Sequence, residues 1–199
     1  MKTSTSDASA TQRSLDLKPH QKEMLQETVG FMPEPRRALL CLPSGMTDQL
    51  GGKLFEQILP GILTLPLQIV VLGKGSTAYG KLLSTYANAE PHRVAILKHT
   101  ADASKLLLAG ADMALFCAPE EEPEFHRALS LGAVPIAPVC PLLEDYNPNQ
   151  ERGNAFLYEE CTPWHCFAAI VRALETYRFP FDWKTIQRHG LESDIGTRT

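Results

Sequence analysis

Apolar runs of strand length alternate along this chain with stretches in which apolar residues recur at helical spacing. Such alternation is typical of a parallel sheet whose two faces are covered by helices. The runs predict six strands, at residues 38–42, 67–72, 93–97, 113–117, 134–137 and 155–158. The stretches between them predict helices near residues 19–29, 50–62, 78–87, 103–108, 124–131 and 163–177. We therefore expect an α/β, Rossmann-like domain with a six-stranded, mostly parallel sheet.

The predicted helix at residues 163–177 has a clear start in the sequence. Thr162 can accept a hydrogen bond from the first free backbone N–H groups, and Pro163 suits the first helical position. Apolar residues then recur on one face, which we assign to the core. Residues 179–183 are expected to form a connector that leads into a last short helix at residues 184–189.

The length of 199 residues fits one domain with a short tail. Residues 1–17 predict a disordered N-terminal arm, and residues 18–199 the folded domain. The arm is rich in Ser and Thr but has no hydrophobic centre, so we expect no secretory signal in it and a cytoplasmic location. A remnant of a plastid transit peptide is the alternative, which the single basic residue before Arg13 disfavours.

The charge and hydrophobicity exclude several classes of partner. The formal net charge is -4 and the sequence pI is about 5.9, which argues against a general affinity for nucleic acid or an anionic membrane surface. The chain is 44% hydrophobic and 21% charged, as in ordinary globular domains. No apolar stretch approaches the roughly 18 residues that a membrane span needs.

The five cysteines are scattered, and most of them lie in apolar runs, which favours free thiols in a reducing compartment. Cys161, His165 and Cys166 invite a metal interpretation. Their spacing does not match a zinc knuckle, and they fall at the start of a predicted helix. We therefore expect no metal, and no motif in the sequence points to a bound cofactor.

Several segments of the chain together carry a resemblance to a known family. They are KEMLQ at residues 22–26, AGADM at 109–113, GAVPI at 132–136, DYNP at 145–148 and ALETYR at 173–178. In this order they resemble the C-terminal, donor-nucleotide lobe of bacterial and plant starch and glycogen synthases. Those enzymes are retaining glucosyltransferases of the two-lobed GT-B type that use ADP-glucose. The resemblance implies that this chain has the fold of one GT-B lobe.

The first departure from the family lies after the first predicted strand. A transferring synthase must stabilise the negative charge that gathers on the ADP leaving group, and the family does so with the Arg and Lys of S-R-L-T-x-Q-K-G. Here the segment at residues 44–51 reads SGMTDQLG. Gly45 stands at the Arg position and Leu50 at the Lys position, so both cations are absent. Lys53, about one helical turn further on, is the candidate substitute.

The second departure lies after the fourth predicted strand. The family's E-P-C-G-L-T-Q supplies a carboxylate to the sugar and a helix start to the phosphates. Here the segment is about two residues shorter and reads APEEEP at residues 118–123. If the chain is active, the resemblance makes Glu121 or Glu122 the sugar-facing, catalytic carboxylate. The alternative is an acidic helix start in solvent, which the helix dipole favours.

The third departure is the loop after the fifth predicted strand. The family approaches the donor there with the backbone of T-G-G-L. Residues 138–144 read PVCPLLE, which contains no glycine and two prolines that offer no N–H.

Some elements of nucleotide binding persist. Gly73, Lys74 and Gly75 keep the family's G-x-G turn, although this short motif is weak by itself. His99 stands where the family places a Tyr that stacks on adenine, and an imidazole can stack there less well. The alternative for His99 is an exposed residue at a strand end.

From these departures we expect a degenerate synthase-like domain that is not catalytic alone. It would act as a binding or regulatory module for ADP, ADP-glucose or an α-glucan, or dock a partner protein where the N-terminal lobe would pack. The alternative is the donor-binding half of an active ADP-glucose-dependent glucosyltransferase whose N-terminal lobe is supplied separately. Lys53 or Lys74 would then replace the missing cations. A third hypothesis is a structural subunit without a small ligand.

Overall fold

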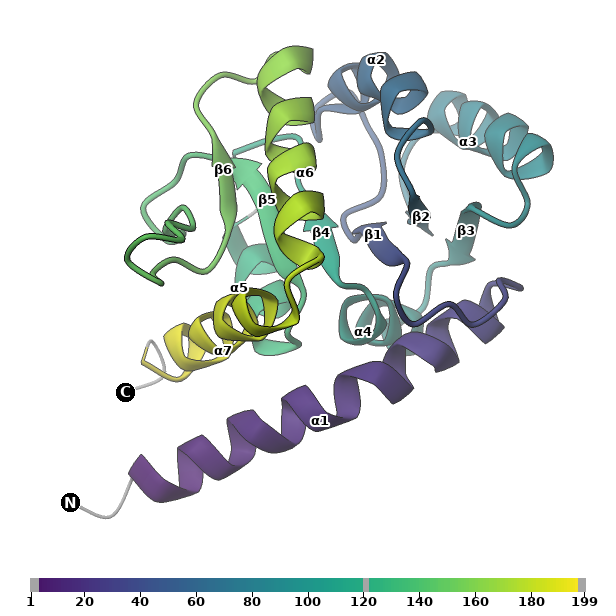
Figure 1. Ribbon diagram of the computed structural model, residues 1–199. Coiled ribbons are helices and arrows are strands. Elements are labelled where there is room, and N and C mark those ends of the chain that lie inside the picture. Colours follow the sequence, from purple (N-terminus) through teal and green to yellow (C-terminus); the bar gives the residue numbers. More distant parts are fainter. Residues whose placement is uncertain (1–3, 120–121, 197–199) are drawn as a thin grey trace.

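The computed structural model of this chain shows a twisted parallel sheet with helices on both faces (Figure 1). The structure describes residues 4–119 and 122–196, with the side chains of residues 8–119 and 123–193. In these residues the strands are β1 (Ala38–Leu42), β2 (Leu67–Gly73), β3 (Val94–Lys98), β4 (Met113–Leu115), β5 (Val134–Pro138) and β6 (Phe156–Tyr158). The helices are α1 (Ser4–Thr28), α2 (Gly52–Ile62), α3 (Thr77–Ala89), α4 (Ala101–Gly110), α5 (Glu122–Ser130), α6 (Pro163–Tyr177) and α7 (Pro180–Gly196).

The strand order is β3-β2-β1-β4-β5-β6, and every neighbouring pair is parallel. Leu40 at the centre of β1 is in register with Ile69 of β2 and Met113 of β4. The order reverses direction between β1 and β4. In such doubly wound sheets the crevice beyond the carboxyl ends of the strands at this switch point is the usual place for a ligand.

Each face of the sheet carries its own hydrophobic core, because successive strand residues point to opposite faces. Leu40 and Leu42 pack with residues of α2, α3 and α6. Leu39 and Cys41 pack with residues of α1, α4 and α5 on the other face. Strands that are buried on both faces read as continuous apolar runs, and this is the pattern that the sequence shows.

The fold expected from the sequence is confirmed, and the sheet is parallel throughout rather than mostly parallel. The bounds of β1 and α6 are those predicted. The cap expected at the start of α6 is also present, since the Thr162 hydroxyl accepts a hydrogen bond from the His165 N–H over 3.4 Å.

The two ends of the chain differ from the sequence expectation. The structure places residues 4–28 in one helix, α1, where an arm without structure was expected through residue 17. At the other end α7 begins at Pro180, so residues 180–183 are the first helical turn rather than part of a connector. Proline fits a first helical turn, whose N–H groups have no partner within the helix. The division of the chain into an arm and a domain at residue 17 stays a prediction.

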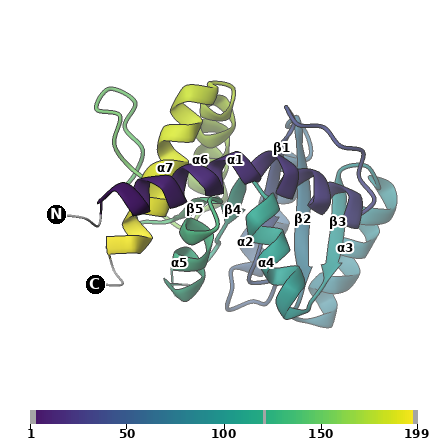
Figure 2. The same cartoon turned by 90° about the horizontal axis from the view of Figure 1, so that it is seen from below.

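The physical reason for the longer α1 is a buried face made largely of polar residues. Thr11, Lys18, Lys22, Leu25 and Gln26 recur at helical spacing, and each is at most 8% exposed. The helix crosses the molecule over α4 and α7, as Figure 2 shows from below. Because four of these five residues are polar, the hydrophobic pattern reveals only the part of the helix from residue 19 onward and misses its first part. Among the described residues no helix is long and apolar enough to cross a membrane.

Candidate functional site

Two loops lie side by side at the carboxyl ends of β1 and β2. They are residues 43–51, called the β1 loop, and residues 74–76, called the β2 loop. The Met46 N–H donates to the Lys74 carbonyl over 2.9 Å, and the Ser76 N–H donates to the Met46 carbonyl over 2.9 Å. These bonds form an isolated parallel bridge between Met46 and Gly75. Two backbone N–H groups are therefore engaged in hydrogen bonds between the loops.

Glycine is required on both sides of this bridge. Gly45 has a φ of 73°, and a Cβ added to it would overlap the carbonyl oxygen of Lys74. Gly75 has a φ of 128°, and its Cβ would overlap the Met46 carbonyl. Both are conformations that residues with a side chain rarely adopt. The backbone of the β1 loop thus leaves no room for a side chain at position 45, where the resemblance to synthases places an Arg.

At the switch point between β1 and β4, the end of the β1 loop packs closely against the segment after β4. Gly51, the N-cap of α2, lies so close to Cys117 after β4 that a Cβ would overlap the Cys117 carbonyl oxygen. Next to it the Tyr79 hydroxyl donates to Asp48 Oδ1 over 2.6 Å. This hydrogen bond, with burial and the Asp48 charge, raises the pKa of Tyr79 to about 12. The β1 loop is therefore held from both sides.

A cavity of about 620 Å³ opens at the same edge of the sheet, between β2, β3 and α3. Gly73, Lys74 and Gly75 line it, and Lys81 on α3 adds a second cation. Its position beside the switch point, its two lysines and the hydroxyl groups of its wall suit a phosphorylated ligand better than an apolar one. The G-x-G turn that the sequence singled out therefore borders a cavity.

The other predicted site residues do not join this cavity. Lys53 is exposed on the first turn of α2, and His99 is exposed after β3. Neither of them lines the cavity. Glu121 lies outside the described residues, and Glu122 is the first residue of α5 with no side-chain description. The proposed roles of these four residues stay predictions.

The described residues hold no cluster of three or more His, Cys, Asp or Glu side chains that could bind a metal. His165, considered above with Cys161 and Cys166 as a metal ligand, contacts Thr162 at the start of α6. The Thr162 Oγ1 and His165 Nδ1 atoms are separated by 2.8 Å. Burial raises the pKa of Cys161, which disfavours the thiolate that a metal would need.

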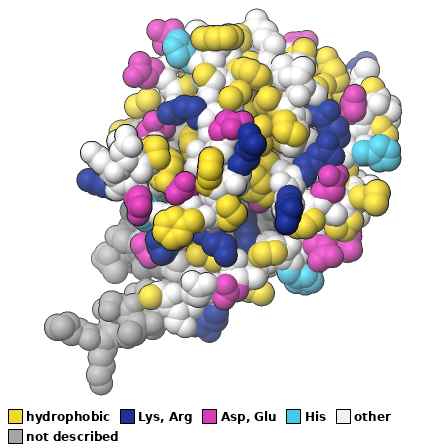
Figure 3. All heavy atoms as spheres, viewed as in Figure 1, with side chains coloured by type: hydrophobic (Ala, Val, Ile, Leu, Met, Phe, Trp, Pro, Cys, Tyr) yellow, Lys and Arg dark blue, Asp and Glu magenta, His cyan; other side chains and the backbone are white. Residues whose placement is uncertain are grey.

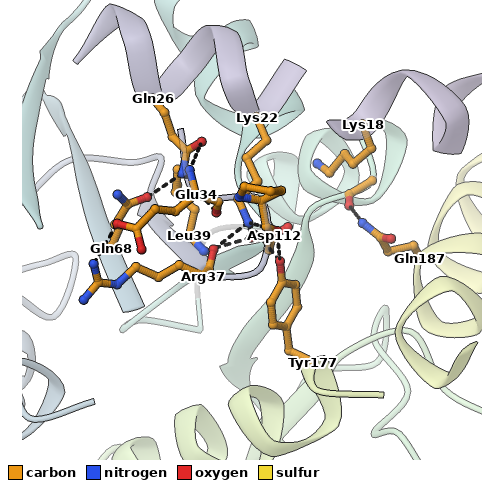
Figure 4. A network of polar contacts seen from close by, with 12 residues as sticks. Lys18, Lys22, Gln26, Glu34, Arg37, Leu39, Gln68, Asp112, Tyr177 and Gln187 are labelled. Carbon is orange, nitrogen blue, oxygen red and sulfur yellow. Dashed lines mark hydrogen bonds and ion pairs between the residues drawn. The ribbon is translucent and has the colours of Figure 1, made fainter. Parts of the chain in front are cut away.

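A buried polar network at the opposite, amino-terminal end of the strands was missed by the sequence reasoning (Figure 4). Lys22 Nζ of α1 lies 2.7 Å from Asp112 Oδ2, which also accepts the Leu39 N–H of β1 over 2.8 Å. The same ammonium donates to the Arg37 carbonyl over 2.6 Å and to the Tyr177 hydroxyl over 2.8 Å. One cation thus ties α1, β1, the start of β4 and the end of α6 together.

Comparisons with known proteins place these features in a family context. A scan against protein-family models finds no match. The chain is 31% identical over 193 residues to a glycogen synthase of Gloeobacter violaceus, covering 93% of this chain and 42% of the relative. It is 28% identical over 195 residues to glycogen synthase 1 of Methylococcus capsulatus, covering 93% of this chain and 40% of the relative. The chain therefore spans about two fifths of the curated relatives it matches.

Solved structures give the same fold. The catalytic domain of starch synthase IV from Arabidopsis thaliana, bound to ADP and acarbose, matches with a TM-score of 0.72 at 19% identity, over 91% of this chain and 41% of that chain. The C-terminal domain of a group 1 glycosyl transferase from Francisella tularensis matches with a TM-score of 0.66 at 12% identity, over 89% of this chain and 93% of that domain. The resemblance to one lobe of a GT-B glycosyltransferase of the glycogen and starch synthase type is confirmed.

Proposed function

We propose that this chain is a degenerate glycogen or starch synthase-like lobe that does not transfer glucose by itself and acts as a binding or regulatory module. The observation that carries the proposal is the bridge between the β1 and β2 loops. It holds Gly45 in a conformation with no room for a side chain, so the leaving-group cation cannot be supplied from that position.

The second missing cation supports the same conclusion. Leu50 stands at the family's Lys position, and it lies half-buried between Asp48 and the start of α2. Its N–H is bound to the carbonyl and the hydroxyl oxygen of Thr47, each over 3.2 Å. A transition state with charge building on a pyrophosphate would find neither cation at this loop. Loss of such preorganised charges removes several kcal/mol of transition-state stabilisation.

The residual ligand of the module is ADP or ADP-glucose bound weakly in the cavity beside Lys74 and Lys81. The starch synthase IV neighbour binds ADP, and a second neighbour of the same fold was solved with UDP and glucose. An α-glucan, or a partner protein on the face where an N-terminal lobe would pack, are the other occupants consistent with the relatives.

Calorimetric titration with ADP and with ADP-glucose tests the binding part of this proposal. We expect a dissociation constant weaker than about 100 µM, because one lobe without the leaving-group cations offers only part of the usual contacts. Lys74→Glu should abolish the remaining heat, and Lys105→Glu, exposed on α4 and outside the cavity, is the matched control. A low-micromolar constant for either ligand would contradict the loss of the donor site.

A second function is consistent with the relatives, which are named as glycogen synthases. It is the donor-binding half of an active glucosyltransferase whose other lobe is supplied separately, with Glu121 or Glu122 facing the sugar. Incorporation of labelled glucose from ADP-glucose into glycogen, measured with the N-terminal lobe of the Gloeobacter violaceus relative added, separates the two functions. Our first proposal expects an inert mixture, and turnover that depends on Glu121 or Glu122 would favour the second.

A further inference from the structure

A second cavity, larger than the one bordered by Gly73, Lys74 and Gly75, lies at the other end of the sheet. It has a volume of about 870 Å³ and runs along α1, between that helix and the junction of α6 and α7. Asp112 and Arg36 in its wall precede β4 and β1, so it opens at the amino-terminal ends of the strands. The G-x-G turn follows β2 at the opposite end of the sheet. The volume of the cavity lies within the range of small-molecule sites.

The wall of this amino-end cavity carries an excess of positive charge. Its basic side chains are Lys18, His20, Lys22, Arg36, Arg178 and Lys184, and its carboxylates are Glu23 and Asp112. Asp112 is already paired with Lys22. The chain as a whole has a net charge of -4, so this surplus is local. In Figure 3, Lys and Arg side chains lie between hydrophobic ones over the region where α1 passes α7.

Two cations of the wall are buried: Lys22, which is 4% exposed and paired with Asp112, and Lys18, which is 8% exposed. Lys18 is the one without such a pairing among the described residues. Its Nζ donates to the carbonyls of Leu108 and Leu131, each over 3.1 Å, which leaves one of its three donors. It forms no ion pair with any residue that the structure describes. Burial lowers its pKa to about 8, with partial compensation from Asp112. A buried ammonium without its own counter-ion is destabilising unless an anion is supplied.

The rest of the cavity suits an anion attached to a ring. Arg36 and Lys184 are exposed at the rim and form no ion pair with described residues, whereas Arg178 pairs with Glu175 over 3.0 Å in solvent. Trp183 and several prolines supply an apolar wall, and the buried Trp183 Nε1 has no hydrogen-bond partner among the described residues. Ammonium, guanidinium and indole groups donate only, so they select a ligand rich in acceptors.

We propose that the amino-end cavity binds a small organic phosphate, with its phosphate group at Lys18 and Arg36 and its ring against the apolar wall. The cations at the rim attract the phosphate from solution, and the guanidinium of Arg36 can hold two of its oxygens. Lys18 then gains the counter-ion that the fold does not give it. This site lies at the other end of the sheet from the nucleotide cavity, so both can be occupied together.

Isothermal titration with phenyl phosphate, inorganic phosphate and benzyl alcohol tests this proposal. We expect phenyl phosphate to bind at least tenfold more tightly than inorganic phosphate, because the ring buries apolar surface, and benzyl alcohol not to bind. Arg36→Glu and Lys18→Met should each weaken phenyl phosphate binding at least tenfold. Lys74→Glu at the opposite edge is the matched control and should leave it unchanged.

Circular dichroism checks that each variant is folded. If Lys18→Met does not fold, Lys184→Glu at the exposed rim takes its place, with the same expected direction. The proposal is overturned if phenyl phosphate gives no heat at about 10 mM, a concentration that detects even weak sites. It is also overturned if Arg36→Glu binds as the wild type does, or if Lys74→Glu removes the binding, which would place the ligand in the nucleotide cavity.

Discussion

Replacing Lys22 by Met removes the cation that joins four segments at the amino-terminal ends of the strands. Met has a similar length and is apolar, so the change deletes the charge with little change in volume. The Asp112 carboxylate then loses its ion-pair partner at 2.7 Å and keeps the Leu39 N–H at 2.8 Å. The side chains of Lys22 and Asp112 are 5% and 8% exposed, so water cannot replace the lost partner.

The expected cost follows from this burial. Breaking a buried ion pair by removing one partner costs about 3–5 kcal/mol, because the remaining charge is left in a poorly solvating environment. A domain of this size is stable by about 5–15 kcal/mol, so Lys22→Met should lower the denaturation midpoint strongly. Asp112→Asn in the same molecule removes the unpaired charge and keeps an acceptor for Leu39. The double variant should therefore cost at least about 1 kcal/mol less than the sum of the two single variants.

Equilibrium unfolding in urea, followed by far-ultraviolet circular dichroism, measures all three variants against the wild type. Lys53→Met on α2 is the control, since Lys53 is exposed and should change stability by less than about 0.5 kcal/mol. The reasoning is refuted if Lys22→Met costs less than about 1 kcal/mol, or if the costs of Lys22→Met and Asp112→Asn simply add.

Three further predictions concern the loops and the buried lysine. Gly45→Arg should destabilise the fold by at least about 2 kcal/mol, because position 45 has a positive φ and no room for a Cβ. Gly80→Ala, near the start of α3 and in open space, should stabilise the fold slightly, and urea midpoints compare the two variants. The pKa of Lys18 is lowered from 10.5 to about 8 in the folded state, so between these pH values the unfolded state binds more protons and the free energy of unfolding rises with pH. Relative to Lys18→Met, the wild type should gain up to about 3 kcal/mol of stability across this window. A difference between the two proteins that does not change with pH would contradict the assignment. Ultraviolet titration should give a pKa of about 12 for Tyr79 in the wild type and a pKa nearer to 10 in Asp48→Asn, because the hydrogen bond to Asp48 is the main cause of the shift. Identical titration curves for the two proteins would argue against that bond.

Much of the fold could be predicted from the sequence because it depends on local pattern. The five apolar residues of β1 and the Thr162–Pro163 start of α6 carry their own signals, and both elements lie where they were expected. The first part of α1 carries no such signal. Thr11 and Lys18 are polar residues that only a partner surface can bury, and that surface is built by distant segments of the chain.

The candidate site divides in the same way. The sequence indicated that Gly45 stands where a cation is expected, since this depends on residue type alone. It did not reveal that the β1 and β2 loops are bonded to each other, because the Met46 and Lys74 backbone atoms meet only in the folded chain. His99 and Lys53, which the resemblance assigned to the nucleotide site, are exposed and do not line the cavity.

The sequence by itself determined the alternation of strands and helices, the family resemblance and the presence of Gly and Leu, rather than basic residues, at positions 45 and 50. These properties depend only on residue types and on their spacing over short stretches of the chain. Only the tertiary structure decided that the β1 loop leaves no room for a side chain at Gly45 and that Lys22 pairs with Asp112. It also decided that Lys18 is buried beside a cavity with no ion-pair partner among the described residues. Such features join residues far apart along the chain, and the free energy of a buried charge depends on all the groups that surround it.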